Sequence, residues 1–373
     1  MDEEERSVNG QQQALSTGTH MNEIFLPLVG QHENIGDIIL RRPLPTWLRR
    51  HGQLHAYVGY GATAAYVRGL GLDDRDLIYH SLTSWLRAWA AAALRGRAHY
   101  FFKPGEIQLT LVGMKEHIGM LPWIVLTRLR RGHVVRIGAG ARNYASLPRA
   151  LMRPSLSLPE LTLWRDADTR NYLKVGEIMP DLGFNEGSTA EQLALEGSRP
   201  LMVVSMRGDR PYPPAAWING VRDSAKALGL QPMVVTQVAR DSNRSQQLAA
   251  ELGAGLLDWD GEKHDVQEEA LREVYRRSAL AVSDRLHVLI GAFTEGTIPL
   301  ALVTDGSPKI RRHLEVVGMG ELAHDSRNLT PHDVVVKARS ALDQRSQWMV
   351  ALATARERLD AVRQQVDGLF GAA

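Results

Sequence analysis

The chain reads SALAVSDRLHVLIGAF over residues 278–293. The small and apolar residues up to Ser283 predict a buried strand, and the apolar run that follows Arg285 predicts a helix. A strand that leads directly into a helix is the repeating unit of an open parallel sheet, which binds ligands beyond the carboxyl ends of its strands. Arg285 and His287 stand at this junction, so the stretch predicts both an α/β fold and the place of a site.

The same alternation of strands and helices occurs on both sides of this stretch. In the second half we expect strands at 201–205, 233–236 and 300–303, with helices near 214–228, 245–252 and 266–278. In the first half we expect strands at 24–29, 55–60, 77–79 and 134–137, with an alanine-rich helix at 85–94. Two such series, joined by a polar stretch at 185–199, predict an α/β protein with two doubly wound, Rossmann-like domains.

The predicted domain boundaries follow from these two series. We expect a disordered leader at 1–21, an N-terminal domain at 22–190, a C-terminal domain at 191–335 and a long final helix at 336–373. Thr330, Pro331 and Asp333 provide a cap, a first-position proline and an acid in the first turn of a helix. One apolar stripe follows from Trp348 to Leu369. We expect this stripe to pack back across the domains, with a coiled-coil dimer as the alternative.

Composition excludes several classes of protein. The chain of 373 residues has 44 Lys and Arg against 42 Asp and Glu, and this balance lacks the positive field that nucleic-acid binding requires. It has no cysteine, which excludes disulfides and thiolate chemistry. No apolar run is long enough to span a membrane, and no signal peptide precedes residue 21, so we expect a cytoplasmic protein. The histidines lack metal-ligand spacing, so we expect no metal site.

Charged residues at two strand ends suggest an anion site. Arg207 follows the strand at 201–205 as Arg285 follows the strand at 278–283, and these arginines and His287 could converge on a small dianion or trianion. Two plainer interpretations remain open on the residues alone. Ser283 or Asp284 could cap the following helix with Arg285 in solvent, and Arg207 could simply pair with the nearby Asp209.

The chain also resembles the polysaccharide pyruvyltransferase family, in motifs spread over residues 34–318. The motifs are NIGD at 34–37, LWRDADTRNYL at 163–173, PDLGF at 180–184, SMR at 205–207, TQ at 236–237, SDRLH at 283–287, GTIP at 296–299 and KI at 309–310. The resemblance implies a GT-B-like fold and the transfer of the enolpyruvyl group of phosphoenolpyruvate to two hydroxyls of a sugar, which forms a ketal and releases phosphate.

The resemblance also implies roles for individual residues. His287 would be the general acid, and Asp37 would be a base or would orient the acceptor, unless it only caps the following helix. Phosphoenolpyruvate would be held in the C-terminal domain by Arg207, Arg285, Ser283, Leu286 and Lys309, and the acceptor by Asn34 and Glu106 in the N-terminal domain. The acceptor would be a glycan or glycolipid precursor of a cell-surface polysaccharide. No metal or other cofactor would be needed, and peripheral binding to the inner membrane face and homo-oligomers remain open.

Two departures from the family keep other functions open. FFKPGE at 101–106 stands where many members have a glycine pair, and Glu295 stands where a neutral residue is expected. An acid at the position of Glu295 is typical of nucleotide-sugar glycosyltransferases of the GT-B type, in which it binds a ribose. Such a glycosyltransferase is therefore the main alternative, and a glycan-binding or scaffold protein with an inert cleft is a third hypothesis.

Overall fold

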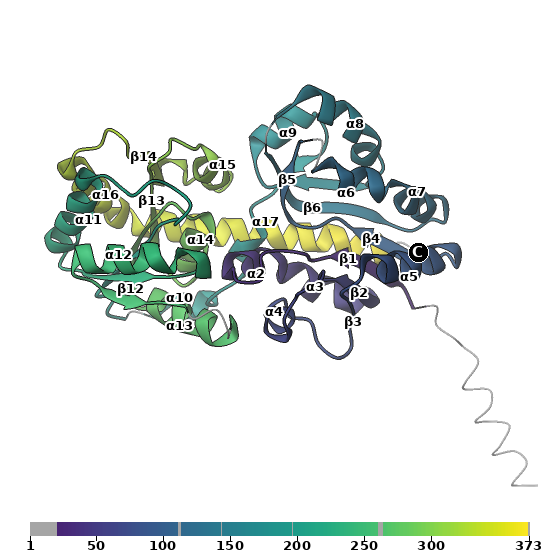
Figure 1. The fold of residues 1–373 in the computed structure, drawn as a ribbon, viewed down its shortest axis with the longest axis horizontal. Coiled ribbons are helices and arrows are strands. Elements are labelled where there is room, and N and C mark those ends of the chain that lie inside the picture. The colour runs from purple at the N-terminus through teal and green to yellow at the C-terminus, as the bar shows by residue number, and fades with distance from the viewer. Residues whose placement is uncertain (1–20, 111–112, 143, 196, 260–263, 372–373) are drawn as a thin grey trace, which may run out of the picture.

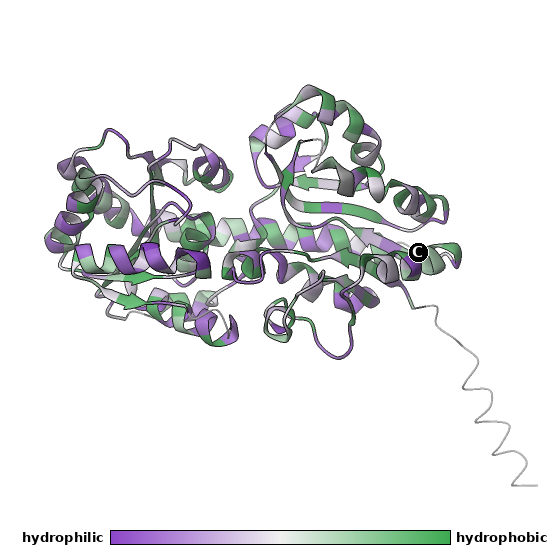
Figure 2. Cartoon of the chain, in the orientation of Figure 1, coloured by the Kyte–Doolittle hydropathy of each residue, from purple (hydrophilic) through white to green (hydrophobic). Residues whose placement is uncertain are grey.

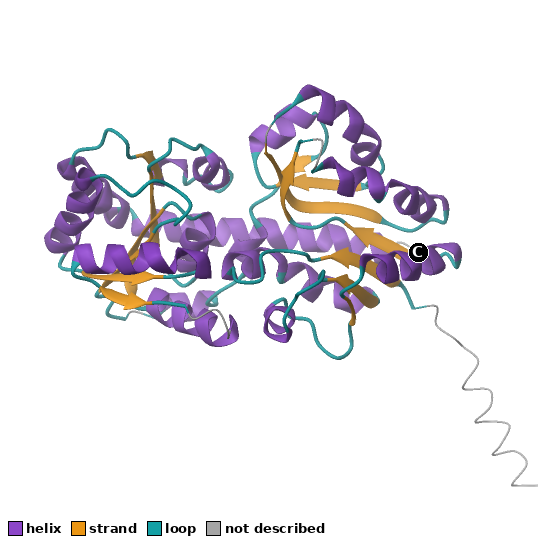
Figure 3. Ribbon diagram, in the orientation of Figure 1, coloured by secondary structure: helices purple, strands orange, loops and turns teal. Residues whose placement is uncertain are grey.

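The computed structural model describes residues 21–110, 113–142, 144–195, 197–259 and 264–371, so the predicted leader, apart from Met21, lies outside the described residues. The chain forms two α/β domains joined side by side (Figure 1). In each domain a parallel sheet lies between layers of helices, as the orange strands between purple helices show in Figure 3. The predicted pair of doubly wound α/β domains is thereby confirmed.

The N-terminal sheet has eight strands, all parallel, in the order β3-β2-β1-β4-β6-β7-β8, with β5 paired to β6. The strands are β1 (Glu23–Pro27), β2 (Gln53–Tyr57), β3 (Leu77–Tyr79), β4 (Ala98–Phe101), β5 (Gly105–Gln108), β6 (Val134–Arg142), β7 (Leu161–Trp164) and β8 (Glu177–Ile178). The helices are α2 (Ile35–Arg41), α3 (Pro43–Leu48), α4 (Ala64–Gly69), α5 (Leu82–Leu94), α6 (Met114–Gly119), α7 (Leu121–Leu129), α8 (Ser146–Ser157) and α9 (Ala167–Leu173).

Both faces of this sheet are buried, because successive side chains of a strand point to opposite faces. On β1, Ile24 and Leu26 pack into one core, and Phe25 packs into another with Trp85 and Trp89 of α5. Strand β6 is green along most of its length in Figure 2, as expected of a strand covered on both sides. This double burial explains why the predicted strands read as short continuous apolar runs.

The C-terminal sheet has six parallel strands in the order β11-β10-β9-β12-β13-β14. They are β9 (Leu201–Ser205), β10 (Gln231–Val235), β11 (Gly255–Leu257), β12 (Ser278–Ser283), β13 (Ile298–Val303) and β14 (Ala323–Asp325). The helices are α10 (Ala190–Ala194) in the connecting segment, then α11 (Ala215–Leu228), α12 (Ser242–Leu252), α13 (His264–Arg276), α14 (Leu286–Thr294) and α15 (Lys309–Glu315). If the six strands are numbered 1 to 6 along the chain, their order in the sheet is 3-2-1-4-5-6, which is the order of the Rossmann fold. The strand order reverses between β9 and β12.

The C-terminal segment forms two helices where one long helix was expected. Helix α16 (Pro331–Asp343) begins with the predicted capping box between Thr330 and Asp333. It ends at Gln344, whose side chain donates to the Ser340 carbonyl and whose backbone (φ −95°, ψ 16°) leaves the helical region. Helix α17 (Arg345–Gly371) starts at the next residue, and the Trp348 N–H donates to the Gln344 carbonyl at 3.2 Å.

Helix α17 lies along both domains, where Figure 1 shows it as the long yellow helix. At its start, Arg345 Nη1 donates to the Gly296 carbonyl in the C-terminal domain at 2.7 Å. Near its end, Asp367 Oδ1 lies 2.7 Å from His51 Nε2 in the N-terminal domain, and the Phe370 ring stacks on His51. The apolar stripe of α17 is therefore buried by residues of the same chain.

Buried histidines make the stability of the N-terminal domain sensitive to acid. Burial lowers the pKa of His55 and of His99 to about 4, and that of His117 to about 3. A histidine whose folded pKa is depressed takes up its proton more readily in the unfolded chain, near pH 6.5. We therefore expect the free energy of unfolding to fall as the pH falls from about 6.5 towards 4.

Chemical denaturation at a series of pH values measures this slope. The variant His117→Phe should make the slope shallower, because a ring without a titratable group then packs beside Phe102. An unfolding free energy that stays constant over the same pH interval would contradict the prediction.

Candidate functional site

A cavity of about 890 Å³ lies between the two domains, at the carboxyl ends of both sheets. In each sheet the strand order reverses once, between β1 and β4 and between β9 and β12. Ligands of open α/β sheets bind at such reversals. The loops that follow β1, β4, β9 and β12 all contribute to the wall, through Gln31, Lys103, Arg207 and Asp284 respectively. The topology therefore brings the two expected binding edges to face each other.

The cavity wall has an excess of positive charge. Ten lysines and arginines line it against five acids, and clefts with one sign of charge attract ligands of the opposite sign. The cations are Arg41, Lys103, Arg142, Arg165, Arg207, Arg210, Arg240, Arg285, Lys309 and Arg312, and the acids are Asp37, Glu106, Asp209, Asp284 and Asp305. The arrangement suits a small ligand with several negative charges.

His287, in the first turn of α14, lines the cavity. From Leu280 to Val303 every residue is buried except His287. Its Nε2 lies 3.6 Å from Oδ2 of Asp181, which belongs to the segment that closes the N-terminal domain. The pair therefore joins an imidazole of the C-terminal domain to a buried carboxylate of the N-terminal domain.

Asp181 is held rigidly in its charged form. Its side chain is fully buried, Arg165 Nη1 donates to Oδ2 at 2.9 Å, and the Gly183 N–H donates to Oδ1. Burial by itself would raise the pKa of Asp181, but the neighbouring His287 and Arg165 hold that pKa well below its usual range. Asp181 is thus a carboxylate at any pH near neutrality.

The NIGD motif packs directly against His287. Helix α2 contacts α14, and a Cβ atom added to Gly36 would lie 2.8 Å from the His287 Cβ, so only glycine allows this approach. The next residue, Asp37, lines the cavity, and its carboxylate accepts from the Gln31 N–H at 2.8 Å and pairs with Arg41. Burial raises the pKa of Asp37, but Arg41, the Gln31 N–H and His287 outweigh it and lower the pKa overall.

Arg285 lies at the start of α14 and is largely buried. It forms a close ion pair through Nε with Asp241, whose other carboxylate oxygen accepts from the Gly208 N–H. Arg285 Nη2 is buried and has no hydrogen-bond partner among the described residues. One end of the guanidinium is thus fixed in place, and the other end has unused hydrogen-bonding capacity beside the cavity.

Arg207 forms the pair with Asp209 that the plainer interpretation predicted, through two bonds of 2.8 and 2.7 Å. It still lines the cavity, and its backbone N–H donates to Asp284 Oδ1. Burial raises the pKa of Asp284 to about 6, although the Arg207 N–H, Arg285 and the Arg207 side chain act against it. Asp284 therefore gains or loses a proton near neutral pH within the cavity wall.

The remaining predicted site residues divide into two groups. Leu286, Lys309, Asn34 and Glu106 line the cavity, and Lys309 Nζ pairs with Glu106 Oε2 at 3.4 Å across the two domains. Ser283 does not line it. Its side chain is buried, donates to the Ser205 carbonyl at 2.6 Å and accepts from the Arg285 N–H. The structure thus corrects the expected contact of Ser283 with a ligand, because its hydroxyl is already used in joining β12 to β9.

Sequence reasoning missed three acids that organise the site. Asp181 stood in the quoted PDLGF motif, Asp284 was considered only as a helix cap, and Asp241 was not considered. The sequence could have indicated that Asp284 belongs to the site, since it lies between Ser283 and Arg285 at the end of a strand. Asp181 and Asp241 could not be assigned partners from the sequence, because their partners lie in other elements of the fold.

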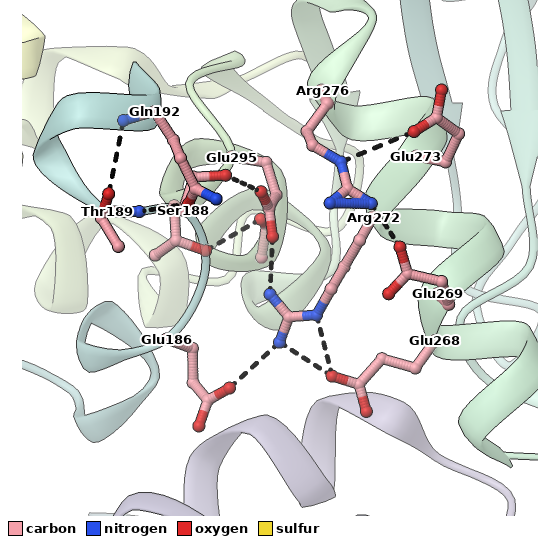
Figure 4. Close-up of polar contacts among 12 residues, drawn as sticks. Glu186, Ser188, Thr189, Gln192, Glu268, Glu269, Arg272, Glu273, Arg276 and Glu295 are labelled. Atoms are coloured by element: carbon pink, nitrogen blue, oxygen red, sulfur yellow. Dashed lines mark hydrogen bonds and ion pairs between the residues drawn. The ribbon is translucent and has the colours of Figure 1, made fainter. Parts of the chain in front are cut away.

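Glu295 is not among the residues that line the cavity. Its position therefore does not support the alternative in which this acid binds a ribose. It is buried, pairs with Arg272 Nη1 at 2.7 Å and accepts from the Ser188 hydroxyl. Arg272 also pairs with Glu268 and Glu186, as Figure 4 shows. The acid thus belongs to a buried ion network behind α14.

The sequence matches no protein-family model and no curated protein. Several solved structures share the fold. UDP-GlcNAc 2-epimerase from Neisseria meningitidis, bound to UDP-GlcNAc, is 10% identical, with a TM-score of 0.54 over 88% of this chain and 94% of that one. Anabaena Alr3699/HepE, in complex with UDP, is 11% identical, with a TM-score of 0.53 over 95% of this chain and 100% of that one. The chain therefore has the two-domain GT-B fold.

No helix in the described ranges has both the length and the apolar character needed to cross a membrane.

Proposed function

We propose that this protein is a ketal pyruvyltransferase that uses phosphoenolpyruvate as donor and a sugar diol as acceptor. The observation that carries the proposal is the cationic cavity built around His287, with the Asp181 carboxylate behind the imidazole. Phosphoenolpyruvate places a carboxylate and a phosphate on one small skeleton, which matches a dense group of arginines. The motifs that resemble the pyruvyltransferase family fall on this cavity, at Asn34, Arg207, Arg285 and Lys309.

The reaction would proceed by protonation followed by two additions of hydroxyl groups. His287 would donate a proton to the methylene carbon of phosphoenolpyruvate, which becomes a methyl group, and the carbon that bears phosphate becomes electrophilic. One sugar hydroxyl adds to that carbon and loses its proton. The C–O bond to phosphate then breaks and inorganic phosphate leaves. A second hydroxyl of the same sugar adds to the same carbon and closes the ketal, and its proton returns to His287. Asp37, on the N-terminal wall of the cavity, would accept the proton of the first hydroxyl.

The arginines would supply the positive charge that this chemistry needs. Arg285 offers the unused Nη2, with Asp241 holding the guanidinium in place. Lys309 extends the cationic wall to the N-terminal domain through its pair with Glu106. That the reaction needs no metal, and that the protein acts in the cytoplasm, remain predictions.

A nucleotide-sugar glycosyltransferase is the second candidate, and the likeness to structures solved with UDP or UDP-GlcNAc favours it. The cavity wall supports it less well. Glu295 is unavailable to a ribose, and among the described lining residues the C-terminal domain contributes no Phe, Tyr or Trp on which a base could stack. The high charge of the wall fits the smaller and more strongly charged donor.

Thermal denaturation with each donor tests the proposal. A ligand that binds only the native state raises Tm, and we expect a rise of several degrees with phosphoenolpyruvate and none with UDP or UDP-sugars. Calorimetric titration then gives the affinity. A rise with UDP alone would favour the glycosyltransferase, and a rise with free glycans alone would favour a binding protein.

Arg285→Lys should weaken the binding of phosphoenolpyruvate about tenfold although the charge is kept, because an ammonium group cannot reach both Asp241 and the ligand as the planar guanidinium does. Titration calorimetry measures the change. Arg339→Lys, on the exposed side of α16, is the control and should bind as the wild type does. Equal affinity of Arg285→Lys and the wild type would remove Arg285 from the donor site.

A further inference from the structure

The N-terminal domain has a surface in which exposed apolar side chains and arginines occur together. It is formed by α6, α7 and α8, which contact one another. Leu129 on α7 is 75% exposed and Leu147 on α8 is 58% exposed, values far above those of core leucines. We call this region the α6–α8 surface. Its exposed apolar residues are Ile118, Val125, Leu129, Leu147 and Leu151.

The exposed apolar residues form stripes along their helices. On α8, Leu147 and Leu151 are one turn apart, and on α7, Val125 and Leu129 are one turn apart. Residues four apart lie on the same side of a helix. The opposite side of each helix is buried, through Met152 on α8 and Ile124 on α7. Each helix thus has an inner apolar side that packs on the domain. Its outer apolar side is exposed and packs against no other described residue.

Helices α7 and α8 contain arginines and no acidic residue. Between Glu116 and Glu160 the chain has seven arginines, of which Arg136 is buried, Arg142 lines the cavity and Arg128 pairs with Glu160. Arg130, Arg131 and Arg153 are exposed, and no described residue forms an ion pair with them. Figure 2 shows purple polar and green apolar segments together on α7 and α8. Exposed leucines among arginines are the pattern of segments that bind the interface of an anionic bilayer.

The α6–α8 surface continues to the mouth of the cavity. Strand β6 ends at Arg142, which lines the cavity, and Tyr144 lines it as well and is 39% exposed. Helix α8 begins two residues later, and Leu147 lies in its first turn. A bilayer bound to α8 would therefore lie beside the entrance to the cavity. This position would let an acceptor carried on a lipid reach the site.

We propose that the α6–α8 surface docks on an anionic phospholipid bilayer. The leucines enter the interface between headgroups and acyl chains, and the arginines contact lipid phosphates. Docking depends on this surface and not on the identity of the donor. A failure of docking and a failure of pyruvyl transfer are therefore distinguishable.

Sedimentation of the full chain with vesicles tests the proposal. One set of vesicles is phosphatidylcholine, and in the other about a third of the lipid is phosphatidylglycerol. We expect at least about tenfold stronger binding to the anionic vesicles, weakening as salt is raised, because an arginine near such a surface contributes about fivefold. Equal binding to both vesicles, or no binding to either, would overturn the proposal.

Variants locate the surface. The double variant Leu147→Ser with Leu151→Ser should bind anionic vesicles at least about tenfold less tightly. The matched control is Val336→Ser with Val350→Ser, which changes two exposed apolar residues of α16 and α17 and should bind as the wild type does. Undiminished binding by the leucine variant would contradict the proposal, provided that its Tm and its response to phosphoenolpyruvate match the wild type.

Light scattering tests the other occupant of this surface, a second copy of the chain. If the wild type is a dimer in solution and the leucine double variant is a monomer, the α6–α8 surface is a subunit interface, and the proposal is wrong. If the oligomeric state is the same in both, the surface is free to bind lipid.

Discussion

His287→Ala is expected to lower turnover by at least about 100-fold while phosphoenolpyruvate still binds, because the loss of a general acid affects the chemical step more than the bound ground state. Two observations support this expectation. His287 is the one residue between Leu280 and Val303 that is not buried, and its Nε2 lies 3.6 Å from the buried carboxylate of Asp181. Phosphate release with a glycan acceptor measures turnover, and calorimetry measures donor affinity.

The control for this variant is His332→Ala. His332 is exposed and lies in the first turn of α16, so its loss removes a histidine at a comparable helix position without touching the cavity. Its turnover should equal that of the wild type. A turnover of His287→Ala within a few-fold of the wild type would exclude His287 as the proton donor. It would not contradict the proposal that the cavity binds an anion.

Asp181 should act through His287 as a positioning residue. In Asp181→Asn the imidazole loses the carboxylate that lies 3.6 Å from its Nε2, so we expect turnover to fall about tenfold while the affinity for phosphoenolpyruvate stays within a few-fold of the wild type. A merely structural role would lower Tm and donor affinity together with turnover. Turnover, calorimetric affinity and Tm of this variant therefore separate the two roles.

Arg272→Met is expected to lower the free energy of unfolding by about 3 to 5 kcal/mol, because it leaves the buried carboxylate of Glu295 without an ion-pair partner among the described residues. Arg272 pairs with Glu186, Glu268 and Glu295 (Figure 4). Burial by itself would lower the pKa of Arg272, but these carboxylates raise it. Arg42 of the N-terminal domain shares Glu186 and Glu268, so the network also joins the domains.

The same helix provides the control for this variant. Arg276 lies one turn further along α13, is more exposed, and pairs with Glu269 and Glu273 at the surface. Arg276→Met should change stability by at most about 1 kcal/mol, as is usual for exposed pairs. Chemical denaturation of the three proteins gives the comparison. Equal stabilities of the two variants would show that the buried network contributes no more than a surface pair.

Much of the fold could be predicted from local sequence. The strands β9, β12 and β13 and the helices α11 and α14 occur where the apolar runs and their spacing placed them. These signals are reliable because each strand is buried on both faces and so reads as a continuous apolar run. The break between α16 and α17 was not predicted, since neither glycine nor proline stands at or near Gln344 to mark the end of a helix.

The sequence by itself also determined where the charged groups of the site would stand. Arg207, Arg285 and His287 follow strand ends, and a parallel sheet brings all such ends to one edge. Only the tertiary structure decided the partners of these groups. It placed Asp181 beside His287 and Asp241 beside Arg285, and it placed Glu295 in a buried network instead of the cavity. Local periodicity reports which side of an element is buried, whereas the partner of a buried charge depends on how distant elements pack.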